Sequence, residues 1–177
     1  VATHSATDAA GNFASSAGPS SDATIDNTGP TLTISDATPL VTTAGISTAY
    51  TVTYTGAANV TLSNADISIG GTNTTDCQAA VSGTGTSTRT VTVSQCSAPA
   101  GTVHVSIAAG SATDSLGNPS LAAGPSSDAT IDNTSPSVAI SAPSVSLGNS
   151  ATSFVYTLTY TGASSITLGS GDITFGG

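Results

Sequence analysis

The sequence predicts an all-β protein in which an antiparallel β-sandwich of about seven strands recurs in tandem. Composition is the first observation behind this prediction, because the 177 residues include no Lys, Met or Trp and a single Arg. All ten acidic residues are Asp, so most of the good helix formers are missing. An internal repeat and a series of short alternating segments are the second and third observations.

The internal repeat is clearest in "AGPSSDATIDNTGP" at residues 17–30, which returns as "AGPSSDATIDNTSP" at residues 123–136. The offset is 106 residues. Three further pairs of segments keep it: 5–12 with 111–118, 50–57 with 156–163, and 65–71 with 171–177. This period is the length of an ordinary domain and is longer than the unit of a solenoid.

The repeat divides the chain into three parts. Residues 30–135 form one complete unit, residues 1–29 the C-terminal part of a preceding unit, and residues 136–177 the N-terminal part of a following one. We therefore expect a window of a longer tandem array. The alternative is a self-assembling subunit, in which strands of a neighbouring molecule complete residues 136–177. Positions equivalent to 72–106 are missing between the two flanking parts, which would leave that completion imperfect.

The first strands of the complete unit alternate apolar and polar residues. They are expected at 30–36, at 47–55, and as two short strands around a turn within 59–69. In the segment 47–55, Tyr50 and Val52 share one face and Thr residues occupy the other. This pattern is typical of a strand with one buried and one solvated face.

The later strands begin with a hairpin within 78–94 around a Gly-rich loop. The next strand carries Val103, Val105 and Ile107 on one face and is followed by a turn. The last strand is expected within 126–133. Turns between short alternating strands favour a sandwich over a helical fold.

Charge excludes several classes of function. With a net charge of -9, one Arg and no Lys, the chain cannot neutralise nucleic-acid phosphates or bind an anionic membrane surface. No apolar run reaches the roughly 18 residues of a membrane span, so we expect no direct membrane insertion. His4 and His104 are the only ordinary bases, and no pattern around them orients a catalytic triad. We therefore expect no enzyme.

Cys77 and Cys96 are the only cysteines, and they bracket the predicted hairpin. In a Ser/Thr-rich all-β chain such a pair favours a disulfide formed in an oxidising compartment. The alternative is two buried free thiols. A zinc site is disfavoured, because further His or Cys ligands are missing nearby.

Four stretches of the complete unit carry a family resemblance: "YTVTYTGAANVTLSNADISI", "RTVTVS", "GTVHVSIAAGSATDSLGNPS" and "ATIDNTSP". In this order they resemble the bacterial immunoglobulin-like repeats of giant surface adhesins and biofilm-associated proteins. The resemblance implies tandem immunoglobulin-like sandwiches, beads-on-a-string arrays and export to the cell surface. It also implies calcium at domain junctions, as in several such adhesins. The chain departs from the family in its cysteine pair and in lacking the Lys of the Lys–Asn isopeptide crosslinks of some adhesin domains.

Asp and Asn residues form a candidate junction site. In an immunoglobulin-like sandwich, the loop that contains Asp114 and Asn118 faces the incoming linker, so we expect it near Asp26 and Asn27. Three or four such oxygen ligands would suit Ca²⁺. Equivalent partial sites are expected at Asp8, Asn12, Asp132 and Asn133. The alternative is plain turn chemistry, in which Asp accepts backbone N–H groups and Gly or Asn takes positive φ.

The sequence as a whole indicates a structural tandem-repeat segment of a secreted bacterial surface fibre or adhesin stalk, which provides extension and spacing. Its expected location is extracellular, at the bacterial cell surface. Its expected partners are neighbouring repeats of the same chain or fibre, and identical chains laterally. Two alternatives stay open: a polymerising fibre subunit completed by strand exchange between neighbours, and a ligand-binding adhesin module. The four Tyr and three Phe form no cluster that would mark a ligand site.

Overall fold

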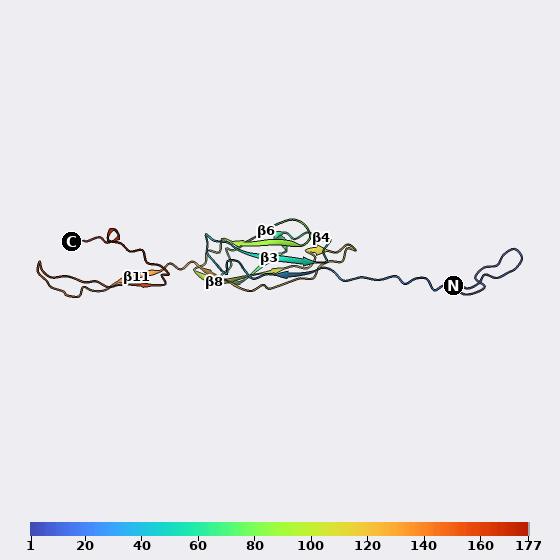
Figure 1. The fold of residues 1–177 in the computed structure, drawn as a ribbon, viewed down its shortest axis with the longest axis horizontal. Coiled ribbons are helices and arrows are strands. Elements are labelled where there is room, and N and C mark those ends of the chain that lie inside the picture. Colours follow the sequence, from blue (N-terminus) through green and yellow to red (C-terminus); the bar gives the residue numbers. More distant parts are fainter. Residues whose placement is uncertain (177) are drawn as a thin grey trace.

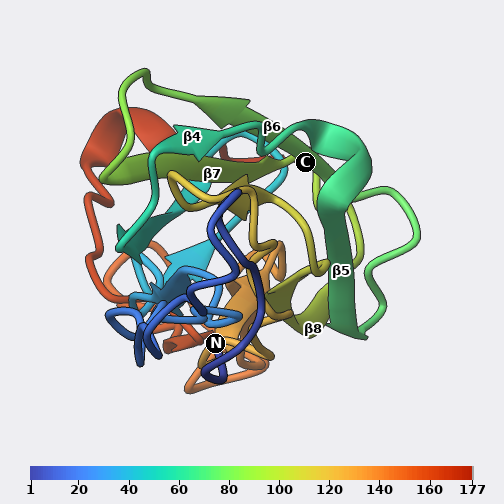
Figure 2. The same cartoon turned by 90° about the vertical axis from the view of Figure 1, so that its right-hand side faces the viewer.

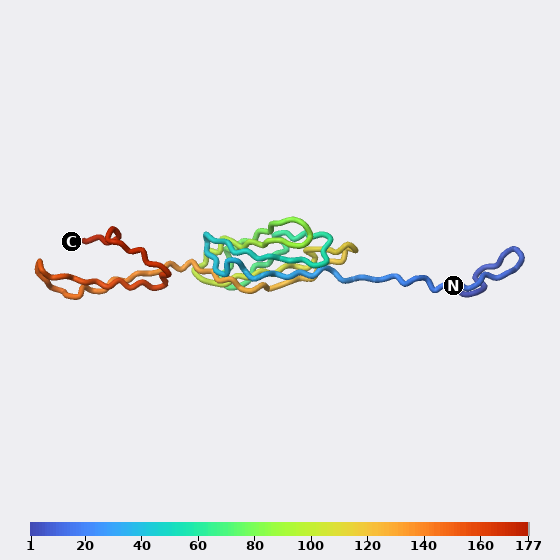
Figure 3. The backbone as a smooth tube through the Cα atoms, in the orientation of Figure 1, coloured from blue at the N-terminus to red at the C-terminus, as the bar shows by residue number. Residues whose placement is uncertain are grey.

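The computed structural model describes residues 1–176, so that Gly177, the last residue of the expected segment 136–177, lies outside the described residues. Figure 1 shows a β-sandwich at the centre of an elongated molecule, with the two flanking segments at opposite ends. The backbone trace in Figure 3 follows the same path, from the N-terminal arm through the sandwich into the C-terminal arm. The sandwich falls within the complete repeat, residues 30–135.

Two four-stranded sheets form the sandwich, and they are seen along the long axis in Figure 2. The first sheet has the order β1 (Thr31–Ile34), β3 (Thr48–Thr55), β7 (Thr88–Ser94) and β6 (Gln78–Ser82). The second sheet has the order β2 (Val41–Thr42), β10 (Ala129–Asp132), β8 (Ala100–Ile107) and β5 (Ile67–Thr72). The shorter elements are β4 (Asn59–Val60), which pairs with β9 (Ala112–Thr113), and the 3₁₀ turn η1 (Asn64–Asp66).

The all-β sandwich is therefore confirmed, with two differences in detail. Seven strands of residues 30–135 have four or more residues, but β2, β4 and β9 add three strands of two residues each. One strand departs from the antiparallel arrangement, because β2 pairs in parallel with β10. After β1 the chain crosses to the second sheet without reversing its direction, so β2 runs the same way as β10.

The core lies between the sheets and is built from the inward faces of the alternating strands. Tyr50, Val52, Val103 and Ile131 are each 0% exposed, which confirms the inward faces that the alternation predicts. Tyr50 also spans the sandwich, because its Oη donates a hydrogen bond to the carbonyl oxygen of Val103 at 2.8 Å. Burial raises the pKa of Tyr50 and keeps this hydroxyl protonated as a donor.

The predicted disulfide is confirmed. Cys77, just before β6, is bonded to Cys96, just after β7, with an S–S distance of 2.08 Å. The bridge therefore ties the open ends of the β6–β7 hairpin. Cys96 is fully buried, so the bridge is packed against the edge of the core.

The C-terminal arm starts the same fold again. Strands β11 (Ser137–Ile140) and β12 (Leu158–Thr161) pair in the register of β1 and β3, so that Ser137 faces Thr161 as Thr31 faces Thr55. A second 3₁₀ turn, η2 (Ser170–Asp172), follows at the position of η1. The local sequence thus specifies these elements even where the rest of a sandwich is not present around them.

The N-terminal arm contains no strand of two or more residues among those described, although it holds the counterpart of β10. Ile25 is the counterpart of Ile131 at the 106-residue offset. Ile25 is 83% exposed, whereas Ile131 is 0% exposed. The same sequence therefore forms a buried strand only where neighbouring strands receive it.

Candidate functional site

The candidate site consists of the two linkers and the loops that hold them at opposite ends of the sandwich. The upstream linker, residues 26–29, reaches the sandwich at its upstream pole, beside the loop 114–120. The downstream linker, residues 132–135, leaves at the downstream pole, beside the loop 95–99.

Asp114 closes the upstream loop on itself. Its Oδ1 accepts hydrogen bonds from the backbone N–H groups of Leu116 at 2.9 Å and Asn118 at 2.8 Å. Its Oδ2 accepts one from Nδ2 of Asn118 at 2.8 Å. Gly117 takes a φ of 89°, which glycine adopts without steric cost. The side-chain hydrogen bond from Asn118 is the main cause that lowers the pKa of Asp114.

Asp8 and Asn12 form the same turn in the N-terminal arm. Asp8 Oδ1 accepts hydrogen bonds from the backbone of Ala10 and Asn12, both at 2.9 Å, and its Oδ2 accepts one from Nδ2 of Asn12 at 2.9 Å. The Asn12 side chain is again the main cause that lowers the pKa of the carboxyl. Because no complete sandwich surrounds this copy, the turn follows from the local sequence alone.

The upstream linker is held by a hydrogen bond and by a close backbone contact. Asn118 Nδ2 donates to the carbonyl oxygen of Asp26 at 3.1 Å, so these two residues meet as the sequence predicts. Gly29 lies so near the loop that a Cβ there would be 1.9 Å from the carbonyl oxygen of Pro119. Only glycine fits this approach. The equivalent residue of the downstream linker is Ser135, so the next junction cannot copy this contact without a shift.

The downstream linker is held by the side chain of Asn133. Its Nδ2 donates hydrogen bonds to the carbonyl oxygens of Cys96 at 2.8 Å and Ala98 at 2.7 Å. Its Oδ1 accepts one from the backbone N–H of Ala44 at 2.7 Å. The backbone N–H of Asn133 adds a fourth bond, to the carbonyl oxygen of Pro99 at 2.9 Å. The chain is therefore fixed to the sandwich at the point where it leaves β10.

Both linkers also contain an Asp–x–Thr turn. Asp26 Oδ1 accepts a hydrogen bond from the backbone N–H of Thr28 at 2.9 Å, and Asp132 Oδ1 accepts one from Thr134 at 3.0 Å. The two turns differ at their central residue, Asn27 or Asn133, because the side chain of Asn27 makes no hydrogen bond among residues 1–176. Asn133 thus acquires its partners from the sandwich and not from the linker.

In this structure the expected calcium ligands are hydrogen-bonded to one another and to the backbone. Among residues 1–176, no group of three or more His, Cys, Asp or Glu side chains could hold a metal ion. At the upstream pole, both carboxylate oxygens of Asp114 already accept N–H groups. Asn118 presents its amide nitrogen, a donor, to Asp26. At the downstream pole Asn133 is likewise occupied by backbone partners. The residues in this geometry satisfy one another as turns and anchors.

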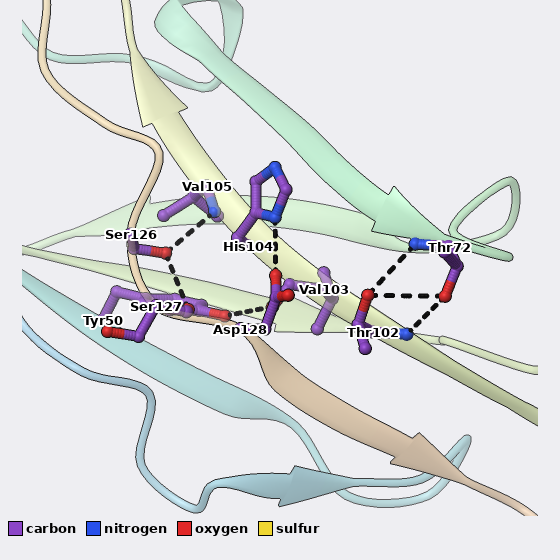
Figure 4. Close-up of polar contacts among 9 residues, drawn as sticks. All are labelled: Tyr50, Thr72, Thr102, Val103, His104, Val105, Ser126, Ser127 and Asp128. Atoms are coloured by element: carbon purple, nitrogen blue, oxygen red, sulfur yellow. Dashed lines mark hydrogen bonds and ion pairs between the residues drawn. The ribbon is translucent and has the colours of Figure 1, made fainter.

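Outside the linkers, the side chains of His104 and Asp128 are hydrogen-bonded on the second sheet. Nδ1 of His104 lies 2.7 Å from Oδ1 of Asp128. Figure 4 shows His104 on β8, the strand that also carries Thr102, and Asp128 beside it just before β10. The ring covers Gly70 of the neighbouring strand, where a Cβ would lie 2.3 Å from Nε2. The imidazole therefore bridges β5, β8 and the start of β10 on the outer face of the second sheet.

Comparison of the chain with protein-family models, with curated proteins and with solved structures found no match. Within the described residues, no helix has the length and the apolar character needed to cross a membrane.

Proposed function

We propose that this chain is a structural segment of a secreted bacterial surface fibre or adhesin stalk, in which tandem immunoglobulin-like sandwiches provide extension and spacing. The attachment of the linkers at opposite poles is the observation that carries the proposal. A chain that enters a sandwich at one pole and leaves it at the other adds the length of that sandwich to the array.

The anchors favour a stiff array over a flexible one. A linker whose ends are bonded to the sandwich has few free torsions, so a bend must break hydrogen bonds. Asn118 fixes the upstream linker to the sandwich that follows it, and Asn133 fixes the downstream linker to the sandwich that precedes it. Each joint of an array would then be held from both sides.

Small-angle scattering on proteins with one to four consecutive copies of residues 30–135 tests this proposal, with Ser135→Gly at each junction to keep the close contact that Gly29 makes with Pro119. The maximum dimension should grow by a constant increment with each copy. That increment should be at least about 27 Å, because β8 alone has eight residues at about 3.4 Å each. Replacing Asn118 and Asn133 by Ala in every copy should shorten the average dimension while each unit stays folded. Copies that collapse into a compact particle would contradict the proposal.

The proposal also predicts the mass of the natural polypeptide and its location. We propose neighbouring repeats as its partners and the outside of a bacterial cell as its location, with the Cys77–Cys96 disulfide as support for an oxidising compartment. The natural polypeptide should then be far heavier than the 16.8 kDa of this chain, and protease added to intact cells should degrade it. A cytosolic, protease-protected polypeptide would contradict this part.

A polymerising subunit is the second candidate, and the C-terminal arm favours it. Its apolar residues line an open trough of about 540 Å³, with Ile140, Phe154 and Leu168 among them. These positions would be covered if a neighbour supplied strands, as Ile131 is covered in the complete unit. In that case Ile25→Asp should abolish oligomers of this chain, because Ile25 would be the inserted residue. Oligomers that persist in this variant would exclude the exchange of that strand.

Calcium at the junctions stays a prediction, because the expected ligands are present in sequence although they are bonded to one another. Binding of Ca²⁺ would require the Asn118 amide to turn its oxygen inward and the N–H donors to leave Asp114. Calorimetric titration with Ca²⁺ tests this directly. A heat of binding that is lost in Asp114→Ala would support the site, and the absence of heat would exclude it.

A further inference from the structure

The outer face of the first sheet carries threonine in place of charge. On β3, Thr51, Thr53 and Thr55 point outward, opposite to the buried Tyr and Val residues between them. On β7, Thr88, Thr90 and Thr92 do the same. We refer to the outward side chains of β1, β3, β7 and β6 as the threonine face.

The strand register places these threonines in rows across the sheet. Thr53 lies between Thr33 of β1 and Thr88 of β7, and in the next row Thr51 pairs with Thr90. The outward residues of β6 that extend the rows are Gln, Ala and Ser, which are also uncharged. On β1, β3 and β7 the neighbouring rows thus form a regular array of threonines, each with one methyl and one hydroxyl group.

The threonine face lacks charged side chains, whereas the outer face of the second sheet carries them. The chain has ten Asp residues, and none of them lies in β1, β3, β6 or β7. The only Arg, Arg89, is on β7 but points inward, where it donates a hydrogen bond to the carbonyl oxygen of Val60. The second sheet differs, because its outer face presents His104 and Asp128 (Figure 4). Asp132, at the end of β10, is exposed as well.

The following repeat keeps the same face. At the 106-residue offset, Thr159 and Thr161 of β12 correspond to Thr53 and Thr55 of β3. Their partners on β11 are Ala and Ser, so this part of the face is uncharged again. In a tandem array, the face would therefore recur once in every repeat.

We propose that the threonine face is the surface through which identical chains contact one another side by side. Two copies of a chain with net charge -9 repel one another wherever their carboxylates approach, so the uncharged face is where they can meet. A contact between identical faces must be self-complementary. Hydroxyl groups satisfy this condition, because each donates and accepts, whereas carboxylates of one sign do not.

The size of the face sets the strength of the contact. Four strands about 4.8 Å apart and about six residues long on average cover roughly 380 Å². A standard stable interface buries about 800 Å² on each partner. One repeat should therefore associate weakly, and an array of repeats should gain strength because each added contact is intramolecular. The proposal goes beyond the stalk function and does not depend on it.

Nuclear magnetic resonance on the labelled chain at increasing concentration tests the proposal. We expect concentration-dependent shifts of backbone amides in β3 and β7, in about 0.5 M salt to screen the general repulsion between copies. Shifts confined to residues 136–176 would overturn the proposal, because they would locate the contact in the apolar trough of the C-terminal arm. A chain that shows no shifts and sediments as a monomer would overturn it as well.

Two substitutions at the centre of the face distinguish a specific contact from general charge effects. Thr53→Asp and Thr53→Lys should each raise the dissociation constant at least about tenfold, because either places like charges opposite one another in a contact between identical faces. General repulsion predicts otherwise, since Lys lowers the net negative charge and should strengthen association. Thr130→Asp and Thr130→Lys, on the outer face of the second sheet, are the matched controls and should change little. If Thr53→Lys strengthens association, or the Thr130 variants weaken it equally, the proposal is wrong. The scattering test of the stalk is unaffected by either outcome.

Discussion

Replacing Asn133 by Ala tests whether side-chain hydrogen bonds hold the downstream linker to the sandwich. The substitution removes the bonds to the carbonyl oxygens of Cys96 and Ala98 and the bond from the N–H of Ala44. It leaves the backbone bond from residue 133 to Pro99 in place. The effect therefore isolates the amide side chain.

The magnitude follows from the three bonds that are lost. A hydrogen bond within a protein contributes about 0.5–1.5 kcal/mol net, and the half-buried position of Asn133 favours the lower half of that range. We expect Asn133→Ala to lower the free energy of unfolding by about 2 kcal/mol. For a unit of this size the loss corresponds to a fall in the melting temperature of about 8 °C. Asn133→Asp should cost at least as much, because a carboxylate oxygen would face the two carbonyl oxygens that now accept N–H groups.

Urea unfolding of the oxidised chain, followed by tyrosine fluorescence, measures the effect. Asn27→Ala is the matched control, because Asn27 occupies the same sequence motif but its side chain has no hydrogen bond among residues 1–176. The control should leave the midpoint unchanged. The reasoning is refuted if the free energy of unfolding of Asn133→Ala differs from that of the unchanged chain by less than about 0.5 kcal/mol. That is about the scatter of a neutral surface substitution. The reasoning is equally refuted if Asn27→Ala destabilises as much.

Three further predictions concern the disulfide, one carboxylate and one buried hydroxyl. Reducing the Cys77–Cys96 bridge, which joins residues 19 apart, should lower stability by about 3 kcal/mol, and a melting curve that stays unchanged with both thiols free would contradict this. The pKa of Asp114 is lowered by folding, so its contribution to stability is fully present above the unfolded value of about 3.9 and is lost as pH falls through the folded value. Asp114→Asn should therefore reduce the loss of stability on acidification, as measured by urea midpoints from about pH 5 to about pH 2. An unchanged loss of stability over this range would count against the role of this turn. Tyr50→Phe should cost about 1 kcal/mol through the lost bond to Val103, whereas Tyr156→Phe, at a half-exposed tyrosine, should cost nothing measurable in the same unfolding assay.

The sequence predicts the long strands well because each carries its own periodic signal. Tyr50 and Val52 are buried and Thr51 is exposed, as the two-residue alternation requires. The two-residue strands β2 and β9 give no such signal, since a period cannot be read from two residues. The parallel pairing of β2 with β10 was missed for another reason. It depends on the chain changing sheets between Ile34 and Val41, which is a property of the tertiary fold.

The candidate site was predicted in part. The repeat and the expected sandwich brought Asn118 to Asp26, and the structure places them in contact. The sequence does not specify which end of the Asn118 amide faces its neighbours, and this orientation decides between a metal ligand and a hydrogen-bond donor. The role of Asn133 had no local signal at all, because its partners lie 35, 37 and 89 residues away in the chain.

The two poles of the sandwich hold their linkers by different numbers of hydrogen bonds, and Cys96 lies at the pole with more of them. Its carbonyl oxygen accepts a hydrogen bond from Asn133, and its sulfur is bonded to Cys77 at the start of β6. Tension on the downstream linker therefore passes through Asn133 into a segment that is covalently joined to a second strand. At the upstream pole, the linker is held by the Asn118 hydrogen bond and the close packing of Gly29, with no covalent bond. Three hydrogen bonds of the Asn133 side chain hold the downstream linker, whereas one bond from Asn118 and the packing of Gly29 hold the upstream linker. Each junction of an array would therefore be weaker on the side of the sandwich that follows it than on the side of the one that precedes it.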